Sequence, residues 1–409
     1  MQKVPTPCIS LFNEALNFLS AYGGSSILLC TATQPALDFV KHKLNIAPDG
    51  EIIQDLDHVT EAFKRVQLVD LASNESSTNQ TILDLTQQLL QEKNSILIIL
   101  NTKSVVRNLY SEMKAANTDG EITLYHLSTS MCAAHRKVKL ASMREDLQAG
   151  KKVICISTAL IEAGVDVSFE CVIRSLAGLD SIAQAAGRCN RHGEHDLQQV
   201  YIVDHTEENL KHLTEVNRGK RITRKILIDL RNQPELYGGS PLSISAMKRY
   251  FQEFYSESES ELDYRIPKLG ISMTSLLFAS PRYNKYLEEY QNQNKARPPQ
   301  FLMNSYRTAA EHFRVIDSPA KTVLVPYEDG KEIIAELNGA GRIEDLTKLM
   351  RRAQAYTVNL FEHELRRLDR SGGLESCLDG KVLVLKDGAY NDEFGMDVEN
   401  ESWSGELLY

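Results

Sequence analysis

The chain has 409 residues, of which 42% are hydrophobic and 25% charged, and its formal net charge at pH 7 is −9. This length predicts two or three domains, and the composition is that of a water-soluble globular protein with a sizeable core. The net negative charge argues against a protein that binds polyanions over its whole surface, although an acidic protein can still have a local basic cleft.

The cysteine pattern and the apolar runs bear on the compartment. The seven cysteines are dispersed without a CxxC pair, which excludes a zinc ribbon and a thioredoxin-like site. An odd, scattered set is typical of a reducing compartment. The first residues carry no signal-peptide pattern, and no apolar run reaches the ~20 residues that a membrane helix needs. We therefore predict a cytoplasmic protein with no membrane segment.

Short apolar runs alternate with amphipathic stretches over the first half of the chain. The predicted strands are 25–30, 66–70, 95–100, 122–127, 152–157, 171–175 and 199–204. The predicted helices are 10–22, 81–93, 105–116 and 132–147. This alternation, with strands that read as continuous apolar runs, is typical of a parallel sheet covered on both faces. Residues ~60–205 are therefore predicted to form one doubly wound α/β domain.

The pattern changes after residue 205. A charged helical stretch covers 209–233, and 256–261 (SESESE) and 296–300 (ARPPQ) carry loop or linker signals. Further on, the predicted strands are 313–317, 321–327 and 381–388, with a helix at 343–356. These elements predict a smaller α+β domain at the end of the chain.

Hydroxyl and amide side chains follow several predicted strands directly. They are Thr31 and Thr33, Asn101 and Thr102, Ser128 and Thr129, and Thr158. Ligands of such sheets bind beyond the carboxyl ends of the strands, where hydroxyls and backbone N–H groups can hold phosphate oxygens of nucleic acid. At any single site the alternative is helix capping. Their shared topological place favours a common binding edge.

Two arginines, Arg188 and Arg191, stand in the stretch QAAGRCNRHGE at 184–194. At i and i+3 they are predicted to share one helix face. Guanidinium groups suit phosphate oxygens and stabilise the charge that develops in phosphoryl transfer. The alternative is a surface salt-bridge pair. His192 and His195 nearby have a spacing that suits a metal, but a solvated loop is the favoured interpretation, and no metal site is predicted.

Three of these stretches resemble helicase motifs. SILLCTATQP (26–35) resembles motif III of superfamily 2 helicases, ISTALIEAGVDVSF (156–169) resembles motif V, and QAAGRCNRHGE resembles motif VI. YHLSTSMCAAHR (125–136) and the C-terminal stretches at 313–317, 323–327 and 349–360 are similar to the CRISPR-associated helicase-nuclease of type I systems, the type I-C form above all. The resemblance covers nearly the whole chain.

That resemblance implies a RecA-like second helicase lobe followed by a smaller α+β C-terminal domain. The implied segments are 1–60 (tail of the first lobe, with motif III and linker), 61–205 (second lobe), 206–255 (helical linker) and 256–409 (C-terminal domain). The implied ATP-binding residues are Gln184, Arg188, Arg191, Asp166 and Gly164, with the two arginines as catalytic residues facing the γ-phosphate. The implied DNA-binding residues are Thr102, Ser128, Thr129 and Thr158, and the residues coupling nucleotide state to DNA are Thr31, Ala32 and Thr33.

The sequence departs from that family in what it lacks. No GxxxxGK[ST], no DExH or DEAD box and no candidate set of HD nuclease ligands occurs in it. We therefore expect the chain to be the C-terminal part of such an enzyme, beginning after the Walker-B carboxylates. It would need the missing first lobe to bind ATP and Mg²⁺ and would be inactive alone, so whether the chain is itself an enzyme stays open.

The expected partners are single-stranded DNA, the RNA-guided CRISPR surveillance complex, and the missing first lobe and HD nuclease domain on the same or a separate chain. Two other interpretations stay open at this point. One is a standalone single-strand-binding or regulatory module without ATPase activity. The other is a superfamily 2 helicase fragment from a repair or restriction system.

Overall fold

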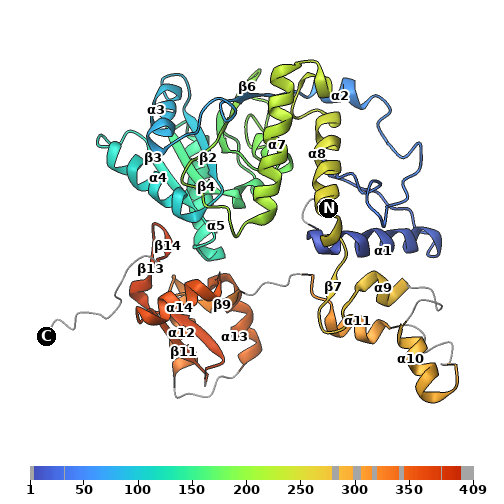
Figure 1. The fold of residues 1–409 in the computed structure, drawn as a ribbon. Coiled ribbons are helices and arrows are strands. Elements are labelled where there is room, and N and C mark those ends of the chain that lie inside the picture. Colours follow the sequence, from blue (N-terminus) through green and yellow to red (C-terminus); the bar gives the residue numbers. More distant parts are fainter. Residues whose placement is uncertain are drawn as a thin grey trace. The chain divides into compact units, whose positions relative to one another are not determined.

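The computed structural model describes residues 4–31, 33–278, 285–297, 305–315, 320–339, 345–378 and 380–397 (Figure 1). The chain forms two compact units, Met1–Glu61 with Asp229–Asp317, and Ala62–Ile228 with Ser318–Tyr409. This grouping by compactness differs from the predicted segments, whose boundaries stay a prediction. We call residues 62–228 the sheet domain and residues 318–409 the C-terminal domain.

The sheet domain is built on six parallel strands in the order β1-β6-β5-β2-β4-β3. The strands are β1 (Val66–Asp70), β2 (Ser95–Leu100), β3 (Thr123–Leu127), β4 (Val153–Thr158), β5 (Cys171–Ser175) and β6 (Gln198–Val203). Every residue of β2, β4 and β5 is buried, because these strands lie inside the sheet with helices on both faces. All six predicted strands in this region are confirmed to within one residue at each end.

Helices cover both faces of this sheet (Figure 1). They are α3 (Asn79–Leu89), α4 (Lys103–Ala116), α5 (Ala133–Gln148), α6 (Leu179–Ala186) and α7 (Thr214–Asn232), with a 3₁₀ turn η2 (Ala159–Glu162) after β4. Side chains of α3 and α4 pack on one set of strand residues, which includes Ile98 and Ile156. Ile182 of α6 and Leu227 of α7 pack with Ile202 in a separate cluster. The predicted doubly wound α/β fold is confirmed.

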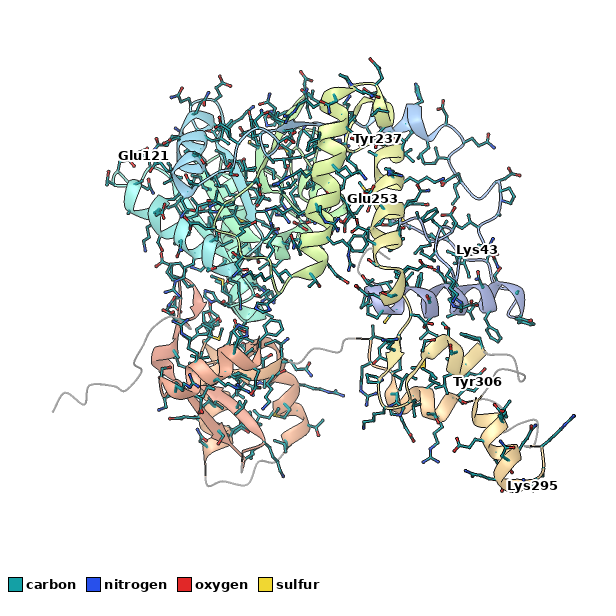
Figure 2. All side chains as sticks on the ribbon, in the orientation of Figure 1. Lys43, Glu121, Tyr237, Glu253, Lys295 and Tyr306 are labelled. Atoms are coloured by element: carbon teal, nitrogen blue, oxygen red, sulfur yellow. The ribbon has the colours of Figure 1, made fainter. Side chains whose placement is uncertain are left out.

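In its described residues, the first unit contains helices and two short strands. Its elements are η1 (Thr6–Cys8), α1 (Ile9–Ala21), α2 (Leu56–Ala62), η3 (Leu236–Gly239), α8 (Ile244–Glu257), η4 (Glu259–Glu261), β7 (Arg265–Ile266), β8 (Ile271–Ser272), α9 (Met273–Phe278), α10 (Lys285–Asn294) and α11 (Tyr306–His312). Asn13 and Asn17 on α1 hold the following loop, donating to the carbonyls of His42 (2.8 Å) and Lys43 (2.9 Å) respectively. Lys43 lies beside α1 in Figure 2.

Two sequence predictions fail in this unit. Residues 25–30, predicted as a strand, have irregular backbone, and Leu28 is 70% exposed. Strand-forming side chains alone do not make a strand, because the backbone groups need a neighbouring strand to pair with. The SESESE stretch is not a loop either: α8 runs to Glu257, and η4 follows at Glu259–Glu261.

The C-terminal domain is a four-stranded mixed sheet in the order β10-β9-β12-β11, covered by helices. Its elements are β9 (Lys321–Leu324), α12 (Asp329–Asn338), α13 (Leu346–Ala353), η7 (Gln354–Tyr356), β10 (Thr357–Leu360), α14 (Glu362–Arg370), β11 (Leu374–Cys377), β12 (Val382–Leu385), η8 (Asp387–Ala389), β13 (Tyr390–Asn391) and β14 (Gly395–Met396). The predicted α+β class of this domain is confirmed. Of the predicted strand 313–317, residues 313–315 are not in a strand, and 316–317 lie outside the described residues.

A seam of ion pairs joins the C-terminal domain to α4 of the sheet domain. Arg107 makes a bidentate contact with Asp397 at 2.6 and 2.9 Å, Lys103 Nζ lies 2.6 Å from Glu364 Oε1, and Lys114 Nζ lies 2.5 Å from Glu393 Oε1. Phe394 adds an aromatic contact, with its ring 5.1 Å from that of His126 and the Arg107 guanidinium 4.7 Å above it. These contacts fix α4, which begins next to the predicted DNA-binding Thr102.

The hairpin β13–β14 also approaches the loop after β3. Gly395 has φ +78°, and a Cβ built there would lie 2.4 Å from the carbonyl oxygen of Ser130. The next residue, Met396, donates its N–H to that oxygen at 2.8 Å. Only glycine combines this backbone conformation with so close an approach. The loop that carries Ser128 and Thr129 is therefore held by the C-terminal domain.

Candidate functional site

The two arginines of the QAAGRCNRHGE stretch lie beyond the end of a helix. α6 ends at Ala186, so the prediction that Arg188 and Arg191 share a helix face is wrong. The backbone pairs with Phe169 instead, which donates to the carbonyl of Arg188 and accepts from the N–H of Asn190, both at 2.9 Å. Asn190 has φ +46°, a left-handed conformation that a helix does not allow. The two arginines therefore do not share a helical turn.

Arg188 is buried, with 7% of its surface exposed. Its Nε donates to the carbonyl of Ile161 at 3.0 Å, and its Nη2 to the carbonyl of Glu162 at 2.6 Å. Both carbonyls belong to η2, directly after β4. Burial lowers the pKa of the Arg188 guanidinium, and the neighbouring Arg191 adds to this effect. Arg188 thus uses its hydrogen-bonding groups to hold the loop after β4.

Arg191 has a different environment. Its side chain is 39% exposed, and its Nε lies 2.7 Å from Oδ1 of Asp166, which is 69% exposed. The hydrogen bond from Arg191 lowers the pKa of Asp166. The structure brings these two predicted residues into contact, and Nη1 of Arg191 also donates to the carbonyl of Gly187 at 3.4 Å. The backbone here lies at the amino ends of the strands, because the Arg191 carbonyl accepts from Arg65, the residue before β1. A partly exposed guanidinium is suited to an anionic ligand.

The other predicted nucleotide residues surround the same loop. Gly164 has φ +73°, a backbone conformation that favours glycine. A Cβ built there would have no atom within 4 Å, so crowding is not the reason for glycine at this position. Gln184 lies on α6, where its Nε2 donates to the carbonyl of Asp180 at 3.3 Å. Gly164 and Asp166 are thus on the loop after β4, while Gln184 comes from the helix that leads to the arginines.

A buried polar network that the sequence motifs did not indicate lies behind this loop. Arg174 on β5 and Glu162 on η2 are each 1% exposed, with Nε and Oε1 2.9 Å apart. Arg174 also donates to Asn101 Oδ1 and to Ser181 Oγ, both at 2.9 Å. Ser181 in turn donates to the carboxylate of Glu162 at 2.8 Å. A charged residue inside the apolar run CVIRS was the signal available in the sequence, because a buried charge requires a partner.

The network extends to Glu208 through the end of β2. Glu208 accepts hydrogen bonds from the side chains of Asn101 (2.6 Å) and Ser175 (2.8 Å), and from the backbone N–H of Asn101. Nothing in the sequence marks Glu208, since it follows the last strand of the sheet in a polar stretch. The network therefore joins residues that follow or end three strands, β2, β4 and β5.

The predicted DNA-binding hydroxyls follow or end β2, β3 and β4. The hydroxyls of Thr102 and Thr158 are buried without a hydrogen-bond partner among the described residues. Ser128 is 1% exposed, and its Oγ accepts from the N–H of Ser130 at 3.2 Å. Thr129 is exposed. Neither Thr102 nor Thr158 makes a helix-capping bond with its side chain, although both occupy N-cap positions.

The predicted coupling residues lie in the first unit. The hydroxyl of Thr31 donates to the carbonyl of Thr33 at 3.1 Å, and Thr33 is buried. Ala32 lies outside the described residues. Their coupling role stays a prediction.

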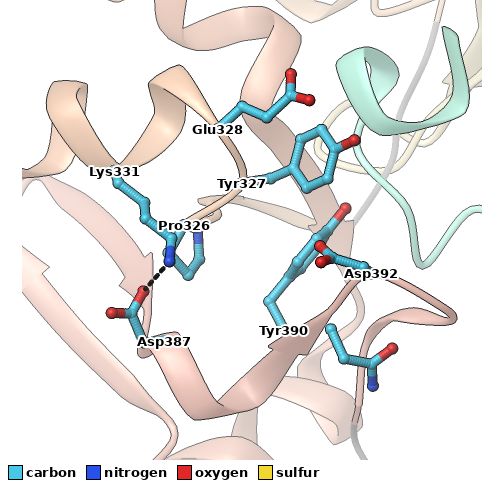
Figure 3. A pocket seen from close by; sticks show the side chains of 8 residues that line it. Pro326, Tyr327, Glu328, Lys331, Asp387, Tyr390 and Asp392 are labelled. Atoms are coloured by element: carbon cyan, nitrogen blue, oxygen red, sulfur yellow. Dashed lines mark ion pairs between the residues drawn. The ribbon is translucent and has the colours of Figure 1, made fainter. Parts of the chain in front are cut away.

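A pocket of about 550 Å³ lies in the C-terminal domain (Figure 3). Its lining residues are Pro326, Tyr327, Glu328, Lys331, Asp387, Tyr390, Asn391 and Asp392, with an ion pair of 3.8 Å between Lys331 and Asp387. None of the predicted site residues lines this pocket. Over the described ranges, no three His, Cys, Asp or Glu side chains are grouped so that they could hold a metal ion. Over the same ranges, no helix is long and apolar enough to cross a bilayer.

Comparisons with known proteins bear on this site directly. Residues 92–194, which run from before β2 to beyond Arg191, match the family of the CRISPR-associated nuclease/helicase Cas3, C-terminal. The CRISPR-associated nuclease/helicase Cas3 of Haloferax volcanii is 55% identical over 71 residues, which cover 16% of this chain and 8% of that protein. The protein of the same name from Streptococcus thermophilus is 21% identical over 328 residues, which cover 72% of this chain and 33% of that protein.

The fold agrees with these sequence matches. The crystal structure of T. fusca Cas3-ATP aligns with a TM-score of 0.50 at 15% identity, covering 82% of this chain and 42% of that one. The chain thus spans between 33% and 42% of the length of these two longer relatives. The predicted resemblance is confirmed: this chain is similar to the C-terminal portion of the CRISPR-associated nuclease/helicase Cas3, and residues 92–194 carry the match to that family.

Proposed function

We propose that this chain supplies the arginine-bearing half of an ATP site in an ATP-dependent single-stranded-DNA translocase of CRISPR antiviral defence. The observation that carries the proposal is the partly exposed guanidinium of Arg191, held beside Asp166 of the segment between β4 and β5. The similar T. fusca structure is that of Cas3-ATP, which supports a nucleotide as the ligand of this guanidinium. Phosphate oxygens of ATP would then replace Asp166 as the partner of Arg191.

The residues present suit one wall of such a site. Arg191 would contact the phosphates, Gly164 allows the backbone of the loop to turn, and Arg188 holds that loop from behind. Mg²⁺ and the loop that cradles the phosphates would come from a first helicase lobe. Hydrolysis depends on positioning and on charge stabilisation by both walls, so we expect no turnover from this chain alone.

The carboxyl ends of β2, β3 and β4 are proposed to bind the backbone of single-stranded DNA. The buried hydroxyls of Thr102 and Thr158 lack partners among the described residues, and unsatisfied buried donors indicate places where a ligand or water is missing. Thr129 is exposed in the loop after β3 and can donate to a phosphate directly. Such contacts are largely independent of base sequence.

The first unit supports association with a further protein domain. Large apolar side chains are exposed there, among them Phe18 (54%), Tyr22 (82%) and Leu28 (70%). Exposed apolar groups gathered along one segment are typical of a surface that a partner covers. We propose the first helicase lobe, together with an HD nuclease domain, as that partner, and the RNA-guided surveillance complex as the body that recruits the assembly.

The test is ATP hydrolysis by the chain with and without a separately produced first lobe that carries a Walker-A motif, in the presence and absence of oligothymidylate. We expect DNA-stimulated turnover only in the mixture. Salt-dependent DNA binding without turnover in the mixture would contradict the ATP site and support a standalone binding module. Failure to bind DNA at low salt would contradict the DNA-binding edge.

A further inference from the structure

We propose that Arg174 is a positioning residue that couples the loop after β2 to the loop after β4. The inference rests on the proposed function, because the first loop contains the DNA-binding Thr102 and the second contains Gly164 and Asp166. A single buried guanidinium connects the two. Arg174 would thereby transmit occupancy of the DNA edge to the loop that faces the nucleotide.

The contacts of Arg174 are shared between the two loops. Nη1 donates to Asn101 Oδ1 at 2.9 Å, and Asn101 is the residue before Thr102. Nε lies 2.9 Å from Glu162 Oε1, at the end of η2 and two residues before Gly164. The planar guanidinium fixes the directions of the bonds that Nη1 gives to Asn101 and Nη2 gives to Ser181, so a displacement of one partner changes the geometry available to the other.

Each end of this connection is anchored to backbone. The carbonyl of Glu162 accepts from Arg188 Nη2 at 2.6 Å, so side chain and main chain of the same residue are both held. The backbone N–H of Asn101 donates to Glu208, and its Nδ2 donates to the carbonyl of Leu176 at 3.1 Å. The hydrogen-bonded route from Arg174 to Glu162 passes through Ser181, which accepts from Nη2 and donates to the Glu162 carboxylate. Movement of either loop therefore reaches Arg174 through bonded groups.

The burial of this ion pair explains why the two loops would move together. Arg174 and Glu162 are each 1% exposed, so water cannot replace a lost partner. Separating them would leave an unpaired charge in a low-dielectric interior, which is strongly unfavourable. A buried ion pair is, however, a weak source of net stability compared with apolar packing. Its presence between two functional loops is better explained by the geometry it imposes than by the stability it adds.

The experiment is amide hydrogen exchange on the full chain, with and without oligothymidylate. Two segments are followed: 101–104, which carries Thr102, and 159–167, which carries the loop after β4. The variants are Arg174→Lys, which keeps the charge but loses the fork, and Asn101→Ala, which removes the other end of the contact. The matched control is Arg144→Lys, because Arg144 Nε donates to the carbonyl of Asp166 at 2.9 Å without touching Asn101.

In the unchanged chain and in Arg144→Lys, we expect oligothymidylate to change exchange in both segments by about twofold or more. In Arg174→Lys and Asn101→Ala, oligothymidylate should still change amide exchange at 101–104. Its effect on amide exchange at 159–167 should be lost. If Arg174→Lys fails to fold, Asn101→Ala alone decides the matter.

The outcomes separate this inference from the proposed function. A response at 159–167 that persists in both variants, or that is absent from the unchanged chain while 101–104 responds, overturns the coupling role of Arg174. No response at 101–104 in the unchanged chain contradicts the proposed DNA edge, and the inference falls with it.

Discussion

Arg191 Nε lies 2.7 Å from Asp166 Oδ1, and both side chains are open to solvent. An ion pair in this environment contributes little to stability, because water and salt screen it and both side chains lose freedom in forming it. The pair holds the guanidinium in place at low energetic cost and releases it easily. Arg188, three residues earlier, is bound to buried carbonyls and has no such freedom.

Replacing Arg191 should therefore remove activity while leaving the free energy of unfolding nearly unchanged. We expect Arg191→Ala to abolish DNA-stimulated ATP hydrolysis in the assembly with a first lobe. Its unfolding free energy should stay within about 0.5 kcal/mol of the unchanged chain. Steady-state turnover and urea denaturation measure the two quantities. Unaltered turnover would contradict the assignment of Arg191 to the nucleotide.

Replacing Arg188 should mainly lower the free energy of unfolding. Arg188→Ala leaves the carbonyls of Ile161 and Glu162 without their partner in a buried place, which costs about 1–3 kcal/mol per unsatisfied group. We expect a loss of about 2 kcal/mol or more in urea denaturation, with Arg191→Ala as the matched control. Equal stability of the two variants would show that the buried contacts of Arg188 contribute nothing.

The seam between α4 and the C-terminal domain predicts an energetic coupling. Arg107 and Asp397 are 25% and 11% exposed and form two hydrogen bonds. A double-mutant cycle with Arg107→Met and Asp397→Asn should give an interaction energy of about 0.5–3 kcal/mol. The exposed pair of Arg307 and Glu311 serves as the reference, with an expected value below about 0.5 kcal/mol. Strictly additive effects at Arg107 and Asp397 would contradict the seam.

Two buried histidines predict a loss of stability in mild acid. Burial lowers the pKa of His126 and of His135 from 6.5 to about 4. Between these values the unfolded chain binds more protons than the folded one, so stability is complete above pH 6.5 and falls as the pH drops towards 4. For each histidine the loss between pH 6.5 and 5 is roughly 2 kcal/mol.

His126→Phe should reduce the slope of this pH dependence, while His135 and His205, whose pKa burial also lowers, continue to titrate. The His126 ring lies among the rings of Tyr110 and Phe394, which suits a phenyl replacement. Unfolding midpoints in urea at several pH values between 7 and 5 provide the measurement. The same slope in the variant and the unchanged chain would exclude His126 as the titrating group.

Much of the sheet domain could be predicted because its strands are read directly from the sequence. Runs such as ILIIL at 96–100 are apolar throughout, since both of their faces are covered, and polar residues flank them. The run at 25–30 has the same appearance and forms no strand, because a strand also requires a partner that local sequence does not specify. The i, i+3 spacing of the two arginines led to a wrong helix prediction for a related reason. The backbone there pairs with Phe169, which lies outside that stretch of sequence.

The candidate site was only partly predictable. Asp166 and Arg191 were identified from motif resemblance, and the structure places them in contact. The buried partners of Arg188 were not predicted, because backbone carbonyls carry no signature in the sequence. Arg174 was not predicted either: it is a charge within an apolar strand, but its link to Asn101, 73 positions earlier, depends on the order of strands in the sheet.

The seam on α4 also has a consequence for synthesis on the ribosome. The last strand of the six-stranded sheet ends at Val203, whereas Asp397, the partner of Arg107, is made much later. At the usual elongation rate of about 5–20 residues per second, roughly 10–40 s pass between synthesis of the last sheet strand and synthesis of Asp397. The contacts between α4 and the C-terminal domain cannot form before then. During that interval His126 and the basic side chains of α4 face solvent, so a chaperone or a polyanion in the cell has a transient opportunity to bind them.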